Sequence, residues 1–293
     1  RADAKRYFDD YARAIEQVGK ACQTLGDKTP APSVSIKLSA LHPRYEFGRR
    51  EQVLTELVDT VIQLVTKARE LDVAVTIDAE EVDRLELSLE VFRAIYQSDA
   101  VKGWGHFGLV VQAYSKRALP VLHYINRLAD EQGDEIPLRL VKGAYWDSEI
   151  KESQQLGVDG YPVYTRKACT DVAYLACAQF LLSDDTRGRI FPQFATHNAH
   201  TVTTILELAN HDSRPFEFQR LHGMGEALYG AAGLGRRVRV YAPVGAHKDL
   251  LPYLVRRLLE NGANTSFVHS FLDPDVPPEQ VVADPIVKVE VGP

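Results

Sequence analysis

Two adjacent arginines toward the C-terminal end of the chain are the strongest candidates for binding a carboxylate. Arg256 and Arg257 lie in the segment 249–261, whose leucines follow the spacing of an amphipathic helix. Tyr253 and Glu260 share the arginine face of that helix, because positions three, four and seven apart lie on one side. Paired guanidiniums form a fork that matches a carboxylate. The segment therefore predicts a helix that covers a site for a small carboxylate, with a plain solvated face as the alternative.

A second concentration of polar and aromatic residues lies in the segment 139–147. A Lys-Gly-Ala turn that begins at Lys142 follows a predicted strand, and such a turn lets backbone N–H groups approach an anion. Tyr145 and Trp146 can form the walls around a flat ring. The residues 165–167 (Thr-Arg-Lys) begin a predicted helix and are a second candidate for a phosphate contact, although an ordinary basic helix start explains them equally well. Two phosphate contacts with aromatic walls suit a dinucleotide.

The segments that must position these residues alternate between strand-like and helix-like apolar spacing. Strands are predicted at 33–39, 73–78, 107–112, 137–142, 190–196, 216–221 and 238–241. Helices are predicted at 2–25, 49–71, 84–98, 116–131, 166–182, 199–210 and 249–261, followed by an irregular tail at 268–293. Sustained alternation indicates a parallel sheet, and its unbroken rhythm favours one barrel over two doubly wound halves. We predict an α/β fold, a TIM-type (β/α)8 barrel that forms one domain over residues 1–293, with its first strand missing from this chain.

Nearly every predicted strand ends in a polar or ionisable residue, and in such barrels the functional site forms at these ends. The residues at or just after the strand ends are Lys37, Asp78, Gln112, Arg139 with Lys142, Thr196, His197 and Asn198, Gln219 with Leu221, and Tyr241. One such residue alone is better explained as a satisfied buried polar group. Because the pattern repeats over the strands, it predicts a shared site.

The composition excludes several other classes of protein. A formal net charge of −6 leaves no basic excess for binding nucleic acid. No apolar run reaches the length of about 18–20 residues that a membrane span needs, and we expect no signal peptide. Cys22, Cys169 and Cys177 are interpreted as small hydrophobic residues in a reducing compartment. His197 and His200 have no acidic third ligand at a metal-binding spacing, so we expect no metal.

Two other functions remain open from the residues alone. A barrel lyase that forms a Schiff base uses a lysine at a strand end, and Lys37 or Lys142 stands at such a position. The other alternative is a module that binds a carboxylate without catalysis. The charged pairs at 80–81 and 83–84 are interpreted as solvated charges and helix caps, not as catalysts.

Five long segments, spread over nearly the whole chain, resemble the proline dehydrogenase domain of bacterial proline utilization A. They are 35–45, 77–81, 139–151, 194–200 and 253–263. The resemblance implies a distorted (β/α)8 barrel that holds FAD non-covalently and oxidises L-proline to Δ1-pyrroline-5-carboxylate by hydride transfer to FAD N5. The first strand of that barrel lies upstream of Arg1 in relatives. The resemblance therefore agrees with the dinucleotide and carboxylate sites indicated by the residues.

The resemblance also assigns roles to residues of this chain. Catalytic roles fall on Lys37, Arg139 and Tyr241. Substrate-binding positions are Lys37, Asp78, Tyr145, Leu221, Tyr241, Tyr253, Arg256, Arg257 and Glu260. Cofactor-binding positions are Asp78, Ala79, Gln112, Arg139, Val141, Lys142, Gly143, Ala144, Tyr145, Trp146, Thr165, Arg166, Lys167, Thr196, His197, Asn198, Gln219 and Glu260. It implies no metal site.

Finally, the resemblance implies partners. L-proline or proline-like carboxylate inhibitors would occupy the substrate site, and a membrane quinone would accept the electrons. We expect no nucleic acid at this part of the protein, and a pyrroline-5-carboxylate dehydrogenase domain on the same full-length chain. The expected location is the cytoplasm, with the full-length protein peripheral at the inner membrane.

Overall fold

The computed structural model describes residues 2–23, 32–209, 214–231, 235–245, 250–251, 253–255, 275–281 and 283–290. The strands are β1 (Ser33–Ile36), β2 (Ala74–Ile77), β3 (Phe107–Gln112), β4 (Ile136–Val141), β5 (Ile190–Ala195), β6 (Glu217–Leu221) and β7 (Arg237–Tyr241). The α-helices are α1 (Ala2–Gln23), α2 (Leu38–Leu41), α3 (Arg50–Glu70), α4 (Leu85–Tyr96), α5 (Ala118–Gln132), α6 (Trp146–Leu156), α7 (Lys167–Leu182), α8 (Ala199–Leu208), α9 (Glu226–Ala231), α12 (Pro278–Val281) and α13 (Pro285–Glu290). Short 3-10 helices are η1 (Phe47–Arg49), η2 (Val82–Arg84) and η3 (Asp184–Thr186).

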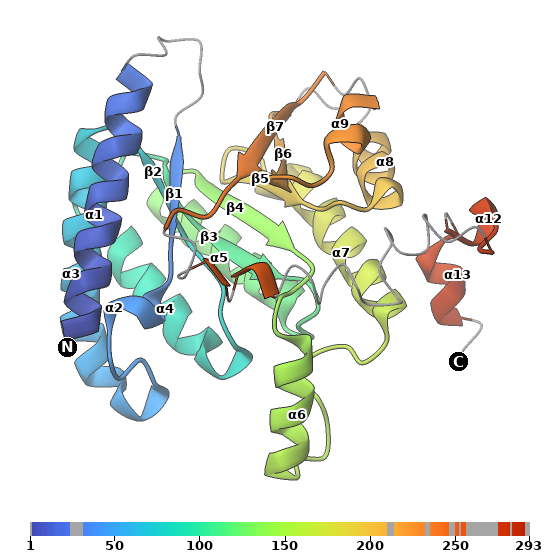
Figure 1. Cartoon of the computed structure of the whole chain (residues 1–293), viewed down its shortest axis with the longest axis horizontal. Coiled ribbons are helices and arrows are strands. Elements are labelled where there is room, and N and C mark those ends of the chain that lie inside the picture. Colours follow the sequence, from blue (N-terminus) through green and yellow to red (C-terminus); the bar gives the residue numbers. More distant parts are fainter. Residues whose placement is uncertain are drawn as a thin grey trace. The chain divides into compact units, whose positions relative to one another are not determined.

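The strands follow one another through the sheet in the order of the sequence, from β1 to β7 (Figure 1). The pairs β1–β2, β2–β3, β5–β6 and β6–β7 are parallel. A sequential parallel order is the progression of a (β/α) barrel, whereas a doubly wound sheet reverses its order near the middle. The predicted α/β fold class is confirmed by this topology.

Several predicted strands were too long, and for β1 and β5 the reason is the helix that follows. β1 ends at Ile36 because Leu38–Leu41 turns into α2, which buries both leucines. β5 ends at Ala195 because the residues after it prepare the start of α8, where Asn198 caps the helix by accepting from the Thr201 N–H. Local apolar spacing shows where a strand lies but does not reveal the capping turn that ends it.

The chain divides into two compact units, and each is described by itself. Unit 1 comprises Arg1–Val111, His123–Arg139 and Gly188–Phe191. In this unit α1 and α3 lie side by side (Figure 1). The Phe92 ring stacks on Phe107 at 5.0 Å and on Tyr96 at 5.7 Å, which fixes α4 against β3. Both α3 and α4 bury apolar side chains, among them Leu57 and Leu64 of α3 and Leu87 and Val91 of α4.

Unit 2 comprises Gln112–Leu122, Leu140–Arg187 and Pro192–Pro293. Its core contains an aromatic cluster in which Phe194, Phe216, Phe218 and Tyr229 lie with ring centroids 5.5 to 6.3 Å apart. The tail at 268–293 was expected to be irregular, but its described part contains α12 and α13. α13 packs on α7, and this contact gives the tail a regular structure that its Pro-rich sequence did not indicate.

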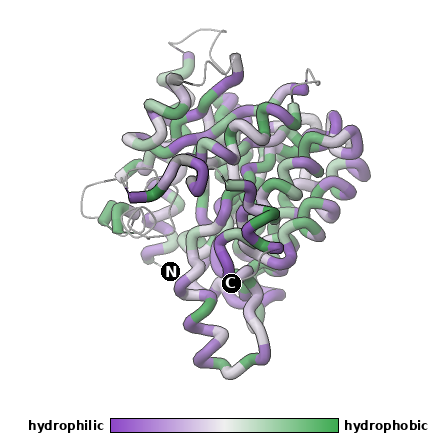
Figure 2. Tube along the Cα trace, turned by 90° about the vertical axis from the view of Figure 1, so that its right-hand side faces the viewer, coloured by the Kyte–Doolittle hydropathy of each residue, from purple (hydrophilic) through white to green (hydrophobic). Residues whose placement is uncertain are grey.

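Helix α6 was not predicted from the sequence. It ends at Gly157, which adopts a left-handed conformation (φ 64°) suited to a helix C-terminus. The α6 hairpin (residues 146–164) forms the projection that points downward in Figures 1 and 2, and Figure 2 shows hydrophobic colouring among hydrophilic residues along it. Leu156 and Val158 are exposed near its tip. Among all helices in the described ranges, none is both long enough and apolar enough to cross a membrane.

Candidate functional site

In unit 1, Arg139 is held by one partner on β1 and by another directly after β2. Its Nη1 donates to Oδ1 of Asp78 at 3.0 Å, and its Nη2 donates to Oγ of Ser35 at 3.0 Å. The Arg139 side chain is 7% exposed and that of Asp78 is 17% exposed, so little water competes for this ion pair. A planar guanidinium bonded at two nitrogens cannot rotate, and Arg139 therefore presents a positive charge in a fixed orientation. Ser35 was not among the predicted site residues.

Lys37 follows β1 and is positioned by a residue that the sequence did not single out. The backbone N–H of Lys37 donates to Oη of Tyr11 at 3.0 Å. Burial, more than the neighbouring carboxylates of Asp78 and Glu80, raises the pKa of Tyr11 to about 12. The Tyr11 hydroxyl therefore stays neutral at physiological pH. Tyr11 lies in the helix predicted at 2–25, but helical spacing does not reveal where its hydroxyl points.

Glu80 also differs from its interpretation as a solvated charge. Its side chain is 7% exposed. One oxygen accepts from the Ser39 backbone N–H at 3.0 Å and the other accepts from Arg84 Nη1 at 3.1 Å. Glu80 thus ties the turn after β2, which carries Asp78, to the turn after β1, which carries Lys37. The interpretation was wrong because the partner on α2 is distant in sequence.

In unit 2, the turn after β4 is tightly packed. Gly143 has φ 149°, and a Cβ at this position would lie 2.5 Å from Cγ of Tyr114. The next residue, Ala144, donates its backbone N–H to Oε1 of Gln112 at 3.2 Å. Only glycine fits this position. The predicted cofactor residues Gln112, Gly143 and Ala144 are thus brought together by the structure.

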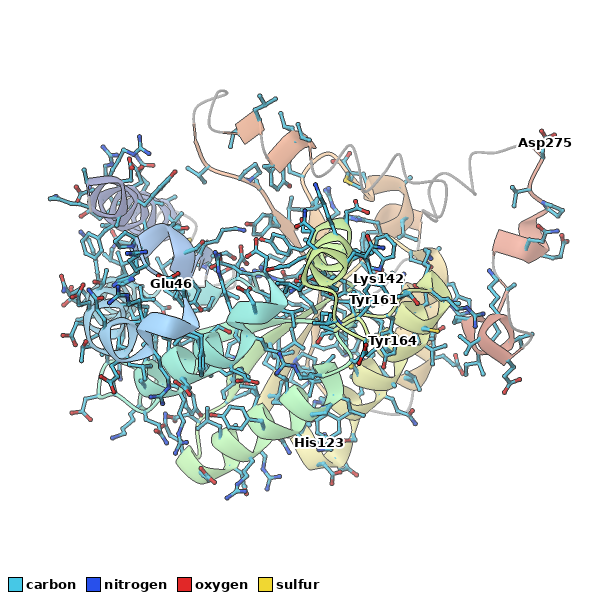
Figure 3. The ribbon with its side chains drawn as sticks, turned by 90° about the horizontal axis from the view of Figure 1, so that it is seen from below. Glu46, His123, Lys142, Tyr161, Tyr164 and Asp275 are labelled. Carbon is cyan, nitrogen blue, oxygen red and sulfur yellow. The ribbon has the colours of Figure 1, made fainter. Side chains whose placement is uncertain are left out.

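Two lysines of unit 2 share one carboxylate. Lys142, labelled in Figure 3, bonds Oδ1 of Asp171 through its Nζ, and Lys167 bonds Oδ2 at 2.7 Å. Burial of Asp171 raises its pKa, but the two ammoniums together outweigh burial and lower the pKa below its ordinary value. Lys142 and Lys167 were predicted separately, and the structure joins them through Asp171, which was missed.

Of the other predicted residues near α6 and α7, Trp146 and Arg166 donate to backbone carbonyls. Trp146 donates its indole N–H to the carbonyl of Tyr164 at 2.9 Å, and its side chain is exposed (Tyr164 is labelled in Figure 3). Tyr145 is half-buried at the N-terminal cap position of α6. Arg166 donates from Nη2 to the carbonyl of Lys288 in α13 at 2.9 Å, and Thr165 beside it is exposed. Arg166 thus helps to hold the tail helix.

The predicted residues after β5 form a hydrogen-bonded loop. The Thr196 carbonyl accepts from Tyr229 Oη at 2.7 Å, and the Thr196 hydroxyl accepts from the Asn198 N–H at 3.1 Å. Nε2 of His197 accepts from the Leu221 N–H at 3.1 Å, so this nitrogen carries no proton. These bonds bring the end of β5 and the end of β6 together. In the described ranges, no group of three or more His, Cys, Asp or Glu side chains forms a metal site.

A polar layer lies below the ends of β5, β6 and β7. Glu217 is fully buried, and its Oε1 accepts from Gln193 Nε2 at 3.0 Å, Gln219 Nε2 at 2.9 Å and Arg239 Nε at 2.7 Å. Arg239 adds a second bond to Oε2 at 3.1 Å. Glu217 fixes the amide of Gln219, the one member of this layer that was predicted. Strand alternation could have indicated Glu217, since 217, 219 and 221 share a face.

Two predicted substrate residues end neighbouring strands, because Leu221 of β6 lies beside Tyr241 of β7 in the register. Tyr253 is half-buried in the short described stretch 253–255. Arg256, Arg257 and Glu260 lie outside the described residues, so their assignments stay predictions. Lys37, Asp78, Ala79 and Arg139 belong to unit 1, and the other described site residues belong to unit 2.

The sequential parallel sheet, with ionisable residues at the carboxyl ends of its strands, defines a protein of the (β/α)-barrel class. A family model described as Proline dehydrogenase matches residues 1–270. The chain belongs to the proline dehydrogenase family, which confirms the resemblance seen in the sequence.

Similar proteins extend this result. The chain is 50% identical over 298 residues to the Bifunctional protein PutA of Escherichia coli (strain K12), which covers 99% of this chain and 22% of that protein. It is 29% identical over 273 residues to Proline dehydrogenase 1 of Bacillus subtilis (strain 168), which covers 89% of this chain and 79% of that protein. A crystal structure of a Bradyrhizobium japonicum Proline Utilization A (PutA) mutant superimposes with a TM-score of 0.92 at 53% identity, over 99% of this chain and 30% of that one. The chain thus spans about a fifth of the length of the PutA relative, and its barrel-type fold is that of the PutA structure.

Proposed function

We propose that the protein is an FAD-dependent proline dehydrogenase, which oxidises L-proline to Δ1-pyrroline-5-carboxylate with transfer of hydride to FAD N5. The observation that carries this proposal is the family match over residues 1–270. The B. subtilis relative adds support, because the matched region makes up 79% of a protein named proline dehydrogenase. The region that this chain spans therefore corresponds to the part of the B. subtilis relative that carries the activity.

The residues of unit 2 fit the diphosphate and ring of FAD. Lys142 and Lys167 supply two cationic donors for an anion, and the turn at Gly143 brings the backbone close to it. Trp146 offers an exposed aromatic face for a flat ring. When bound, FAD supplies a two-electron acceptor.

Proline is a small zwitterion, so its site needs an anion fork at one end and apolar walls around the ring. Leu221 and Tyr241, side by side at the ends of β6 and β7, suit the walls. Arg256 and Arg257 would bind the carboxylate, with charge-assisted bonds of roughly 1.5–3 kcal/mol each. Such bonds orient the substrate so that its C5 hydrogen points at the acceptor, which is the main requirement for hydride transfer.

Unit 1 supplies a fixed positive charge. The guanidinium of Arg139 is held by Asp78 and Ser35, and in the family resemblance it lies against the cofactor. A charge fixed before the reaction stabilises negative charge that develops beside it without reorganising. The proline amine must lose its proton before hydride departs, because the nitrogen lone pair drives the step.

The acceptor and the rest of the chain are part of the proposal. Electrons would pass on to a membrane quinone, and the full-length protein would lie in the cytoplasm in peripheral contact with the inner membrane. The PutA relative is named as bifunctional and is several times longer than the matched region. We propose that a pyrroline-5-carboxylate dehydrogenase domain accompanies this region in the full-length protein.

The test supplies the full chain with L-proline and a soluble quinone. We expect quinone reduction and formation of Δ1-pyrroline-5-carboxylate in equal amounts, with far less turnover of D-proline, whose carboxylate and ring cannot both fit the same walls. Absence of quinone reduction would contradict the proposal. Covalent labelling of Lys37 or Lys142 by borohydride and substrate would instead favour a Schiff-base lyase.

A further inference from the structure

We propose that Asp171 is a positioning residue, which holds Lys142 and Lys167 together as one paired cationic site for the diphosphate of the cofactor. The inference rests on the proposed function, because it concerns how the same FAD is held. Asp171 was not among the predicted site residues.

The geometry of the carboxylate is that of a bridge. Each oxygen of Asp171 takes one ammonium: Oδ1 bonds Lys142 from the turn after β4, and Oδ2 bonds Lys167 from the start of α7 at 2.7 Å. The Asp171 side chain is 16% exposed, whereas those of Lys142 and Lys167 are 28% and 38% exposed. The carboxylate is therefore the buried member, and the two ammoniums are the members that solvent and ligands reach.

Holding the two lysines in place before binding favours the binding of an anion, because lysine side chains are long and flexible. Ordering a rotamer-rich side chain at the moment of binding weakens binding, and a side chain already held avoids that loss. An ammonium has three donors, so it can bond a carboxylate and a phosphate oxygen at once. Two ammoniums around one carboxylate also leave a net positive charge for the diphosphate.

The electrostatics keep the bridge intact at physiological pH. The two lysines hold the pKa of Asp171 below its ordinary value despite burial, so the carboxylate remains ionised. The groups that face it in the cluster are the two ammoniums themselves, one from each side of the bridge.

A purely structural role for Asp171 makes a different prediction. If the bridge only ties the turn after β4 to α7, its loss destabilises the protein and damages every ligand site alike. If the bridge positions the lysines, its loss lowers the affinity for FAD. The proline site is then unchanged once FAD is saturating. The split between the affinity for FAD and the KM for L-proline therefore distinguishes the two roles.

The experiment compares Asp171→Asn with Asp184→Asn in the full-chain holoenzyme. Asp184 is a matched control, because it pairs with Arg187 at 3.0 Å on the exposed surface of the same unit. FAD released on serial dilution is measured by its fluorescence, which gives the dissociation constant without an activity assay. We expect about a tenfold increase in the dissociation constant for Asp171→Asn, and no change for Asp184→Asn. At saturating FAD, the KM for L-proline should equal that of the wild type.

An unchanged or tighter affinity for FAD in Asp171→Asn overturns the proposal, as does a rise in the KM for L-proline at saturating FAD. Should Asp171→Asn not fold, Lys167→Met carries the test with the carboxylate left in place. Lys167→Met is also expected to raise the dissociation constant for FAD about tenfold. An unchanged dissociation constant in this variant would also contradict the proposed pairing of the two lysines. A wild-type protein that binds no FAD contradicts the proposed function itself, which separates that failure from this one.

Discussion

The two units hold their positive charges in different ways. In unit 1, the guanidinium of Arg139 is buried and bonded at two nitrogens to Asp78 and Ser35. In unit 2, Lys142 and Lys167 are partly exposed and share the more buried Asp171. A buried guanidinium in a fixed plane suits a charge that must not move during a reaction, whereas paired ammoniums suit an anion that must be captured from water. Under the proposed function, the fixed charge of unit 1 would orient the reacting groups, and the paired lysines of unit 2 would bind the cofactor.

The largest effect is expected where the buried pair of unit 1 is broken. Arg139→Met leaves Asp78 as a buried carboxylate without its guanidinium, and should lower the free energy of unfolding by about 3–5 kcal/mol. Urea unfolding measures this change. The control is Arg187→Met, whose exposed pair with Asp184 should contribute only about 0–1 kcal/mol. Similar losses in the two variants would mean that burial does not distinguish the Arg139 pair.

A large effect is also expected at the turn after β4. In Gly143→Ala the new Cβ would lie 2.5 Å from the Tyr114 ring, so the turn must move. This movement should lower the free energy of unfolding by about 1–3 kcal/mol and cause loss of FAD. Gly157→Ala is the control, since its φ of 64° is also unfavourable for alanine but no atom lies within 4 Å. Flavin content after gel filtration should fall for the first variant only. Equal flavin content would show that the clash is relieved without moving the turn.

The free energy of unfolding should depend on pH through Asp171, the carboxylate that Lys142 and Lys167 share. The folded-state pKa of Asp171 lies below its ordinary value of 3.8, so ionised Asp171 stabilises the fold above that value, and the contribution is lost as the pH falls through the folded pKa. The stability difference between wild type and Asp171→Asn should therefore be constant from about pH 5 to 8 and shrink below about pH 4. Urea unfolding at these pH values measures it. A difference that already changes near neutral pH would assign it to another group.

The smallest effect is expected at Tyr11, where one hydrogen bond positions Lys37. Tyr11→Phe keeps the ring but removes the acceptor of the Lys37 N–H, and should lower stability by about 0.5–1.5 kcal/mol. Because the pKa of Tyr11 is raised to about 12, the wild-type contribution is fully present below pH 10 and is lost only as the pH rises through the folded value. If Tyr11→Phe is as stable as the wild type at neutral pH, the hydrogen bond to Lys37 does not stabilise the fold.

The sequence predicted what depends on local spacing and missed what depends on distant partners. Strand positions followed from apolar alternation, and Lys37, Asp78 and Arg139 followed from their places at strand ends. Tyr11 and Asp171 were missed because each acts through a bond to a segment far along the chain. Neither Tyr11 nor Asp171 was among the predicted site residues. Periodicity contains no information about such pairings.

Glu217 illustrates the same limit inside the sheet. Its carboxylate lies at the centre of the polar layer that holds Gln219, yet only Gln219 stood at a strand end and was predicted. The register between β6 and β7, which places Arg239 beside Gln219, follows from the sheet and not from either strand alone. The assignments of Arg256, Arg257 and Glu260, which lie outside the described residues, stay predictions.

The central claim is that this chain binds a flavin that L-proline reduces. The most direct measurement is the visible absorption spectrum of the purified full chain, recorded before and after addition of L-proline without oxygen. The account predicts the visible absorption bands of an oxidised flavin, and their loss on addition of L-proline. A colourless protein that takes up no FAD, or flavin bands that L-proline leaves unchanged, would contradict it.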